Sequence, residues 1–127
     1  MISFIQVFLM PKMIRGEVTI YHHPNPEIRS FLTTEEISAP RVEIFKSPLT
    51  EDAEQIRIRL GRIGAHIVKE IMTVPGVDEI HIKPKEVRLK KALTFAWDDI
   101  EEQVVVIMKR ALRRKQIRII RQWSSDG

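Results

Sequence analysis

The sequence predicts an α+β two-layer sandwich, in which a mixed sheet of four or five strands carries two helices on one face, in the order β-β-β-α-β-β-α. The main observation is that the spacing of apolar residues changes repeatedly along the chain between about two and about 3.6 residues. A length of 127 residues leaves room for one core, and 43% hydrophobic with 30% charged residues is typical of a globular domain. We therefore expect a single domain over residues 1–127, with its core over about 14–115 and peripheral segments at 1–13 and 116–127.

The clearest patterns lie in residues 67–111, which form the frame against which the rest of the chain must pack. A helical apolar spacing stops at Pro75-Gly76, because proline cannot continue a helix and glycine frees the backbone. Residues 77–82 and 87–91 alternate apolar with charged side chains, which is the period of half-buried strands. We expect these strands to form an antiparallel hairpin before helical spacing resumes at Trp97.

Three shorter strands are expected before this frame. Alternation predicts the first at residues 17–21 and the second, antiparallel to it, at residues 28–32. Between them, His23-Pro24-Asn25-Pro26 predicts a rigid turn, since proline lacks the N–H that a helix or a sheet ladder needs. The third strand is expected at residues 41–46, with Val42 and Ile44 on one face.

A long helix is expected next, beginning within residues 47–52, where a proline comes early and acidic residues occupy the first turn. Its apolar stripe consists of Ile56, Leu60, Ile63, Ile67 and Ile71. Gly61 and Gly64 each weaken a helix by about 1 kcal/mol relative to alanine, so they indicate a kink or a close approach by another backbone. We expect this helix to form a right-handed crossover between two parallel strands, 42–44 and 77–82.

The last helix begins at Trp97. Its apolar stripe consists of Trp97, Ile100, Val104, Ile107 and Ala111. Because Trp97 starts this stripe, we expect its side chain to be buried. Acidic residues lie near the start of this helix and basic residues near its end, an arrangement that complements the helix dipole.

No segment predicts insertion into a membrane or secretion. Residues 2–10 are apolar but shorter than the roughly 20 residues that span a bilayer, and they lack the features of a signal peptide. Two interpretations remain: an additional strand, or a translation start placed too early, with Met10 or Met13 as the true start. The absence of cysteine fits a reducing compartment, so we expect the protein in the cytoplasm.

The sequence contains no pattern typical of an enzyme. There is no nucleophile motif and no glycine-rich phosphate loop, so we expect no catalytic residue. The positions of His22, His23, His66 and His81 favour separate surface side chains over a metal site. We therefore expect neither a metal nor another cofactor. The net charge of +4 permits an acidic partner without requiring one.

Three segments together carry a resemblance to a known family. The stretch from His23 to Phe31 holds Pro-Asn-Pro followed by a phenylalanine, residues 71–77 form a helix end with a glycine-valine turn, and Trp97-Asp98 opens the last helix. In these features the chain resembles the amino-terminal domain of the Nfu/NifU family. The resemblance covers about residues 17–112.

This resemblance implies a role linked to iron–sulfur cluster assembly or delivery. Full-length members of the family carry a second domain, whose Cys-x-x-Cys pair holds a cluster between subunits. This chain has no cysteine, and iron–sulfur clusters are held by thiolates. The resemblance therefore implies a non-catalytic, protein-binding accessory domain, with a partner from the iron–sulfur assembly machinery, rather than a cluster carrier.

Two surfaces are candidates for the binding site. The first is the proline-rich turn, with Pro24, Asn25, Pro26 and Phe31 as partner-binding residues. The Asn25 side chain there either bonds to local backbone or is presented to the partner. The second is a basic face on the last helix, and it favours the alternative of a basic nucleic-acid-binding domain of ferredoxin-like α+β fold. This basic face consists of Lys109, Arg110, Arg113, Arg114, Lys115 and Arg118.

Overall fold

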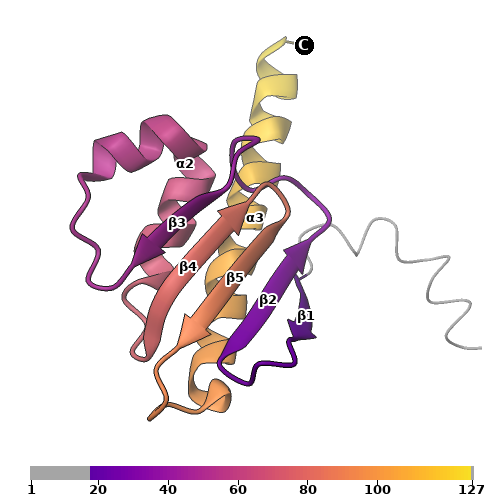
Figure 1. Ribbon diagram of the computed structural model, residues 1–127. Coiled ribbons are helices and arrows are strands. Elements are labelled where there is room, and N and C mark those ends of the chain that lie inside the picture. Colours follow the sequence, from indigo (N-terminus) through magenta and orange to yellow (C-terminus); the bar gives the residue numbers. More distant parts are fainter. Residues whose placement is uncertain (1–17, 127) are drawn as a thin grey trace, which may run out of the picture.

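The computed structural model describes residues 18–126, and it describes side chains as far as Lys115. A five-stranded sheet and two helices follow one another in the expected order, which confirms the α+β class. Figure 1 shows both helices on the same side of the sheet. The alternatives for residues 2–10 lie outside the described residues. The elements are β1 (Val18–His22), β2 (Ile28–Thr33), β3 (Glu43–Lys46), α2 (Ala53–Ile71), β4 (Val77–Lys83), β5 (Glu86–Lys91) and α3 (Trp97–Asp126).

The strands pair in the order β1-β2-β5-β4-β3, and every pair in the described part of the chain is antiparallel. The expectation of a mixed sheet is therefore wrong. It fails at β3 and β4, which are antiparallel neighbours, with Glu43 opposite Ile82 and Lys46 opposite Glu79. These strands are not parallel strands joined by a crossover.

The segment between β3 and α2 explains this difference. Residues 47–52 do not form the first helical turn, because α2 begins only at Ala53. In Figure 1 the chain after β3 instead runs back along the edge of the sheet before the helix starts. The Ser47 N–H donates to the Asp78 carbonyl at 2.8 Å, so β3 ends beside the start of β4. The loop carries the chain back toward the end of the sheet at which β3 began, and α2 then returns it to the end at which β3 finished. Because β4 starts there, beside the end of β3, the two strands pair antiparallel.

Gly61 interrupts α2 and fulfils the first of the two roles expected of the glycines. Its backbone angles, φ 85° and ψ 173°, are not helical, and they divide α2 into two arms, residues 53–60 and 62–71. The interruption leaves the Leu60 carbonyl without its usual partner in the helix. The Ala39 N–H donates to that carbonyl at 3.0 Å, so the loop before β3 satisfies the broken helix.

Gly64 fulfils the second role, a close approach by another segment. A Cβ atom at this position would lie 2.8 Å from Ser38 Cβ and 3.1 Å from the Ile37 carbonyl oxygen. The loop before β3 therefore packs directly on the backbone of α2, and only glycine leaves room for it.

The core lies between the sheet and the helices. Trp97 is 7% exposed, which confirms its expected burial. The stripe of α3 differs from the expectation at one position, since Met108 is fully buried whereas Ile107 is only partly buried. Within residues 18–126, no helix combines the length and the apolar character that crossing a membrane requires.

Candidate partner-binding surfaces

The face of the sheet that points away from both helices forms a surface that sequence periodicity did not single out. We call it the outer face. A row of directly opposed residues crosses all of its strands, and their side chains point the same way because paired residues of neighbouring strands share a face. The row consists of Tyr21, Ser30, Arg88, His81 and Ile44, and the neighbours on the same face include Leu32, Glu79 and Glu86.

Ser30 lies at the centre of a first polar group on the outer face. Its side chain is 1% exposed, and its hydroxyl donates to Glu86 Oε2 at 2.7 Å. A hydroxyl has one proton, so Ser30 Oγ accepts the second contact, from His23 Nε2 at 2.9 Å. His23 opens the turn between β1 and β2, so this group connects the turn to the outer face.

His81 lies at the centre of a second polar group. The Arg88 guanidinium donates to His81 Nδ1 at 3.3 Å, and because arginine has no acceptor, the ring proton must be on Nε2. His81 Nε2 then donates to Glu79 Oε1 at 3.0 Å. Both ring nitrogens are occupied, which leaves neither free for a metal ion. Across the described residues, no three His, Cys, Asp or Glu side chains are grouped so that they could hold one.

Exposed apolar residues border these polar groups. Tyr21 on β1 is 51% exposed, and Ile44 on β3 is 52% exposed. Val42, just before β3, lies on the same face as Ile44, as expected. This face is exposed, whereas Phe45 is buried. Exposed apolar side chains of this size are the kind that binding surfaces cover, although here they flank a polar centre, whereas a typical interface has an apolar centre and a polar rim. Alternation shows which residues of one strand share a face, but only the register shows that these residues meet.

The turn between β1 and β2 is built by local hydrogen bonds. Asn25 Oδ1 accepts from the Glu27 N–H at 2.9 Å, and the Asn25 carbonyl accepts from the Ile28 N–H at 3.0 Å. The local role expected of the Asn25 side chain is therefore present. Pro24, Asn25 and Pro26 are exposed, whereas Phe31 is completely buried. Phe31 belongs to the core and cannot contact a partner directly, which corrects its expected role.

A cluster around Trp97 ties this turn to the last helix. The Trp97 Nε1–H donates to the Pro26 carbonyl at 2.7 Å, across 71 positions of sequence. Arg29 lies over the Trp97 ring at 5.1 Å and also pairs with Glu101 on α3. These contacts fix the position of the turn relative to α3.

The structure divides the expected basic face of α3. Arg114 donates to His66 Nε2 at 3.3 Å, and Lys115 donates to the Glu36 carbonyl, so both point toward neighbouring elements. Lys109, Arg110 and Arg113 are exposed and form no ion pair within the described side chains. The side chain of Arg118 lies outside the described residues.

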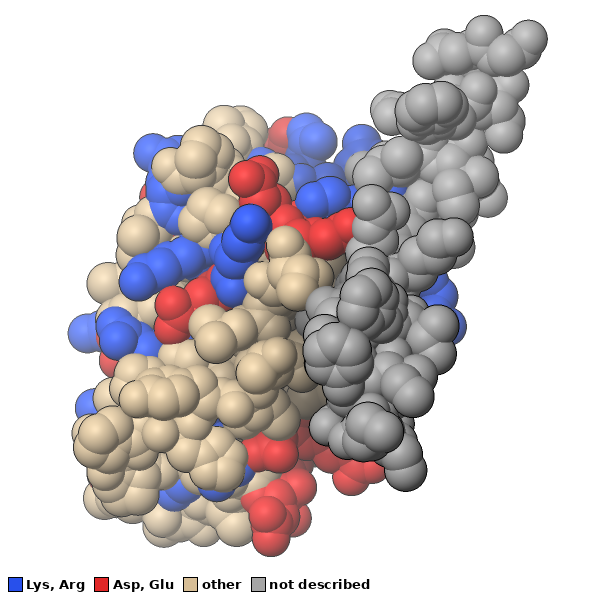
Figure 2. Space-filling view, turned by 90° about the vertical axis from the view of Figure 1, so that its right-hand side faces the viewer, with Lys and Arg blue, Asp and Glu red and all other residues tan. Residues whose placement is uncertain are grey.

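Charge is also unevenly distributed along α3. Figure 2 shows acidic side chains grouped at the lower end of the molecule, the end at which α3 begins, and basic side chains interleaved with acidic ones above. The exposed acids in the first turns of α3 are Asp98, Asp99 and Glu102. Among the described side chains of α3, the exposed bases therefore follow the exposed acids, from Lys109 onward.

Solved structures show what this fold is similar to. The crystal structure of protein SAV1430 from Staphylococcus aureus matches 72% of this chain and 96% of that one, with 14% identity and a TM-score of 0.55. The solution structure of the same protein gives 13% identity and a TM-score of 0.50, over 73% of this chain and 89% of that one. The solution structure of a NifU-like protein from Saccharomyces cerevisiae matches 74% of this chain and 76% of that one, with 19% identity and a TM-score of 0.56.

No protein-family model and no curated protein matches the sequence. At these identities the solved structures show a common fold. That fold is shared with a NifU-like protein.

Proposed function

We propose that this chain is a non-catalytic protein-binding domain that acts in iron–sulfur cluster assembly or delivery in the cytoplasm, as its resemblance to the Nfu/NifU amino-terminal domain implies. The observation that carries the proposal is the contact between Trp97 Nε1 and the Pro26 carbonyl, at 2.7 Å. It joins two parts of the resemblance, the proline-rich turn and the start of the last helix, into one unit. The shared fold with a NifU-like protein supports the same proposal.

The chemistry of the chain favours binding to a cluster carrier over carrying a cluster. The 127 residues include no cysteine, and thiolates are the usual ligands of iron–sulfur clusters. We therefore expect anaerobic incubation with iron and sulfide, followed by desalting, to leave no visible cluster absorbance on this chain. A stoichiometric cluster that survives desalting would contradict this part of the proposal.

The outer face is the surface on which we place the partner. Its central polar groups already have hydrogen-bond partners, such as Ser30 with Glu86 and His81 with Glu79, so covering them leaves few groups unpaired. Exposed Tyr21 and Ile44 provide apolar area on either side of them. The exposed turn adjoins this surface through the contact of His23 with Ser30.

A matched pair of substitutions tests this placement. Ile44→Asp adds a charge to the outer face, whereas Ile58→Asp adds the same charge to α2, where Ile58 is 66% exposed. Immobilised wild-type protein should bind purified cluster scaffold proteins after nuclease treatment, and Ile44→Asp should weaken that binding by about tenfold or more. The Ile58→Asp variant should bind like the wild type, and both variants should melt at a similar temperature.

Failure of every assembly protein to bind, or an equal loss in both variants, would refute the proposed site and partner class. A nucleic acid captured in place of protein would favour the alternative function. Exposed Lys109, Arg110 and Arg113 are the residues that support this alternative. In that case Lys109→Gln with Arg113→Gln should weaken binding and reduce its dependence on salt.

A further inference from the structure

A second concave surface lies on the helical layer, away from the outer face. It is a pocket of about 600 Å³ between residues 47–52 and the two arms of α2. Pro48, Leu49 and Ile56 contribute its apolar lining, together with Ala65 and Met72. This volume lies within the range of about 300–1,000 Å³ that is usual for small-molecule sites.

The kink in α2 creates this pocket. A straight helix would present one convex surface, but the break at Gly61 sets the two arms at an angle, as Figure 1 shows. Ile56 then lines the pocket from the first arm and Met72 from the second, while Leu49 closes it from the preceding loop. The pocket therefore follows from the same glycine that interrupts the helix.

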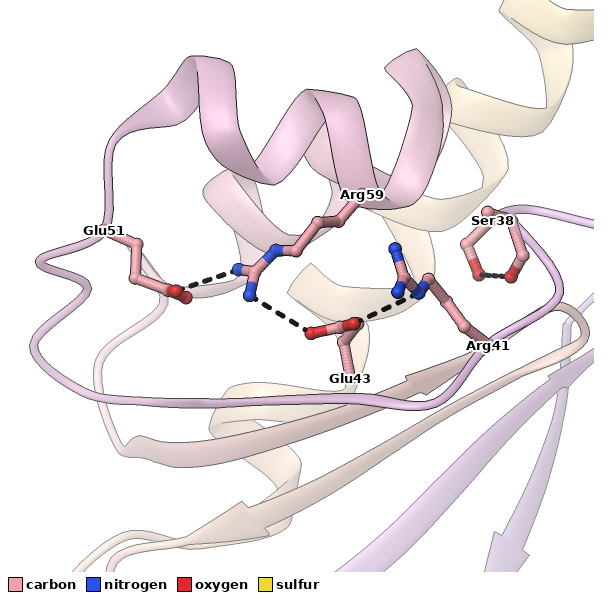
Figure 3. A network of polar contacts seen from close by, with 6 residues as sticks. Ser38, Arg41, Glu43, Glu51 and Arg59 are labelled. Carbon is pink, nitrogen blue, oxygen red and sulfur yellow. Dashed lines mark hydrogen bonds and ion pairs between the residues drawn. The ribbon is translucent and has the colours of Figure 1, made fainter.

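Arg59 holds the loop side of the pocket in place (Figure 3). Its guanidinium lies 2.9 Å from Glu51 Oε1 in the loop and 3.3 Å from Glu43 Oε1 on β3. Arg41 pairs with the other oxygen of Glu43 at 3.3 Å, and the Arg59 guanidinium lies over the Phe45 ring at 5.4 Å. These contacts attach the loop to both β3 and α2, so the pocket is formed before any ligand arrives.

The pairing of the charged residues around the pocket leaves its rim positive. Glu51 is the acidic residue in the lining, and Arg59 neutralises it. Arg57 pairs with Glu54 at 2.6 Å, and this hydrogen bond and charge lower the pKa of Glu54. Arg62 and Lys69 also line the pocket, and neither forms an ion pair within the described side chains.

Helical spacing brings these basic residues together on one stripe. Arg62, His66 and Lys69 occupy positions i, i+4 and i+7 of the second arm, which places them on the same side of the helix. His66 Nε2 accepts from Arg114, which brings a further positive charge from α3 toward the rim. An apolar interior with a positive rim is complementary to a ligand with an apolar body and an anionic end.

We propose that this pocket binds a small organic anion with an apolar body, of the class of medium-chain carboxylates. The apolar chain lies against Leu49, Ile56 and Met72, and Arg62 and Lys69 bind the carboxylate. The volume of the pocket, about 600 Å³, favours a small molecule over a long peptide. This inference does not depend on the proposed protein-binding function, because the pocket and the outer face lie on opposite layers.

Decanoate is a suitable probe, with decanol as its neutral counterpart and decyltrimethylammonium as its cationic counterpart. Titration of decanoate into the ¹⁵N-labelled full chain should give saturable amide shifts in residues 47–57 and 62–73. Decanol and the cation should bind at least several-fold more weakly. Raising the salt concentration should weaken decanoate alone, since the charge contribution is screened.

Substitutions on the rim test whether decanoate binds in this pocket or is attracted nonspecifically to positive charge on the protein. Arg62→Gln with Lys69→Gln should weaken decanoate binding about fivefold to tenfold, as expected for two partly exposed charges. The matched control, Lys109→Gln with Arg110→Gln, removes the same charge outside the pocket and should leave binding unchanged. Ala65→Trp fills the pocket and should abolish binding, provided that its melting curve shows a folded protein.

The proposal would be overturned by shifts that do not saturate, by equal binding of decanol, or by equal weakening in both double variants. Saturable binding of an acidic helical peptide, with no binding of decanoate, would also overturn it and assign the pocket to a protein partner. None of these results affects the scaffold-binding test with Ile44→Asp, so the two proposals can fail separately.

Discussion

The inner and outer faces of the sheet are built from alternate residues of the same strands, yet they differ in chemistry. On the inner face, Ile80, Ile82, Val87 and Leu89 are completely buried against the helices. On the outer face, hydrogen-bonded polar groups occupy the centre, and exposed apolar side chains such as Tyr21 lie around them. The inner face accounts for most of the apolar burial and so for most of the stability that burial provides. The outer face can therefore carry different residues without loss of the fold.

This difference is sharpest on β3, where neighbouring residues fall on opposite faces. Phe45 is 2% exposed and packs in the core, whereas Ile44 is 52% exposed. Both side chains are large and apolar, so residue type alone does not show which of the two is buried. Four experiments test the comparison, in order of decreasing expected effect.

Trp97→Ala should destabilise the protein most. It removes a buried aromatic ring from the core and also the hydrogen bond to Pro26 that holds the turn. We expect a loss of about 3–5 kcal/mol in the free energy of unfolding, measured by urea denaturation, which is a large fraction of the stability of a small domain. A melting temperature within a few degrees of wild type would show that the assigned register of α3 is wrong.

Phe45→Ala and Ile44→Ala form the most direct test of the two faces. Removing the buried ring of Phe45 should reduce the free energy of unfolding by about 3 kcal/mol. The same truncation at exposed Ile44 should change it by less than about 0.5 kcal/mol. Thermal melting of both variants under one condition provides the comparison, and similar losses would mean that β3 does not present Phe45 to the core.

Ser30→Ala tests whether the outer face contributes to stability through its polar groups. The substitution removes the hydroxyl that Glu86 and His23 share, and we expect it to cost about 1–2 kcal/mol. Thr19→Ala, at an exposed hydroxyl of β1, is the control and should be nearly neutral in the same denaturation experiment. If the two variants are equally stable, the buried hydrogen bonds of the outer face contribute little.

Asn25→Ala should have the smallest effect on stability. It removes an exposed side-chain bond to the Glu27 N–H, which should cost about 0.5 kcal/mol. Melting temperature and capture of a scaffold protein should be measured on the same sample. An intact fold with lost capture would extend the binding surface from the outer face to the turn, and unchanged capture would exclude the turn from it.

The sequence by itself determined the elements and much of their orientation. The period of apolar residues predicted the strands of the hairpin, the stripe through Ile56 and Ile67, and the burial of Trp97. Turn chemistry included the local bond of Asn25 among two alternatives, and Gly61 and Gly64 indicated a kink or a close approach. These features depend on residues within a few positions of one another, so the local pattern contains the necessary information.

The tertiary structure decided what depends on residues distant in sequence. Residues 47–52 carry the signals of a helix start, yet they run back along the sheet, and this path makes β3 and β4 antiparallel. The path is stabilised by Arg59, whose bonds to Glu43 and Glu51 connect three separate elements. The row on the outer face likewise forms only when the strands pair in this register, and the pocket beside α2 forms only when the loop and the two arms of α2 are packed together. Periodicity shows which side of an element is apolar. Which element packs against that side depends on how the whole chain folds.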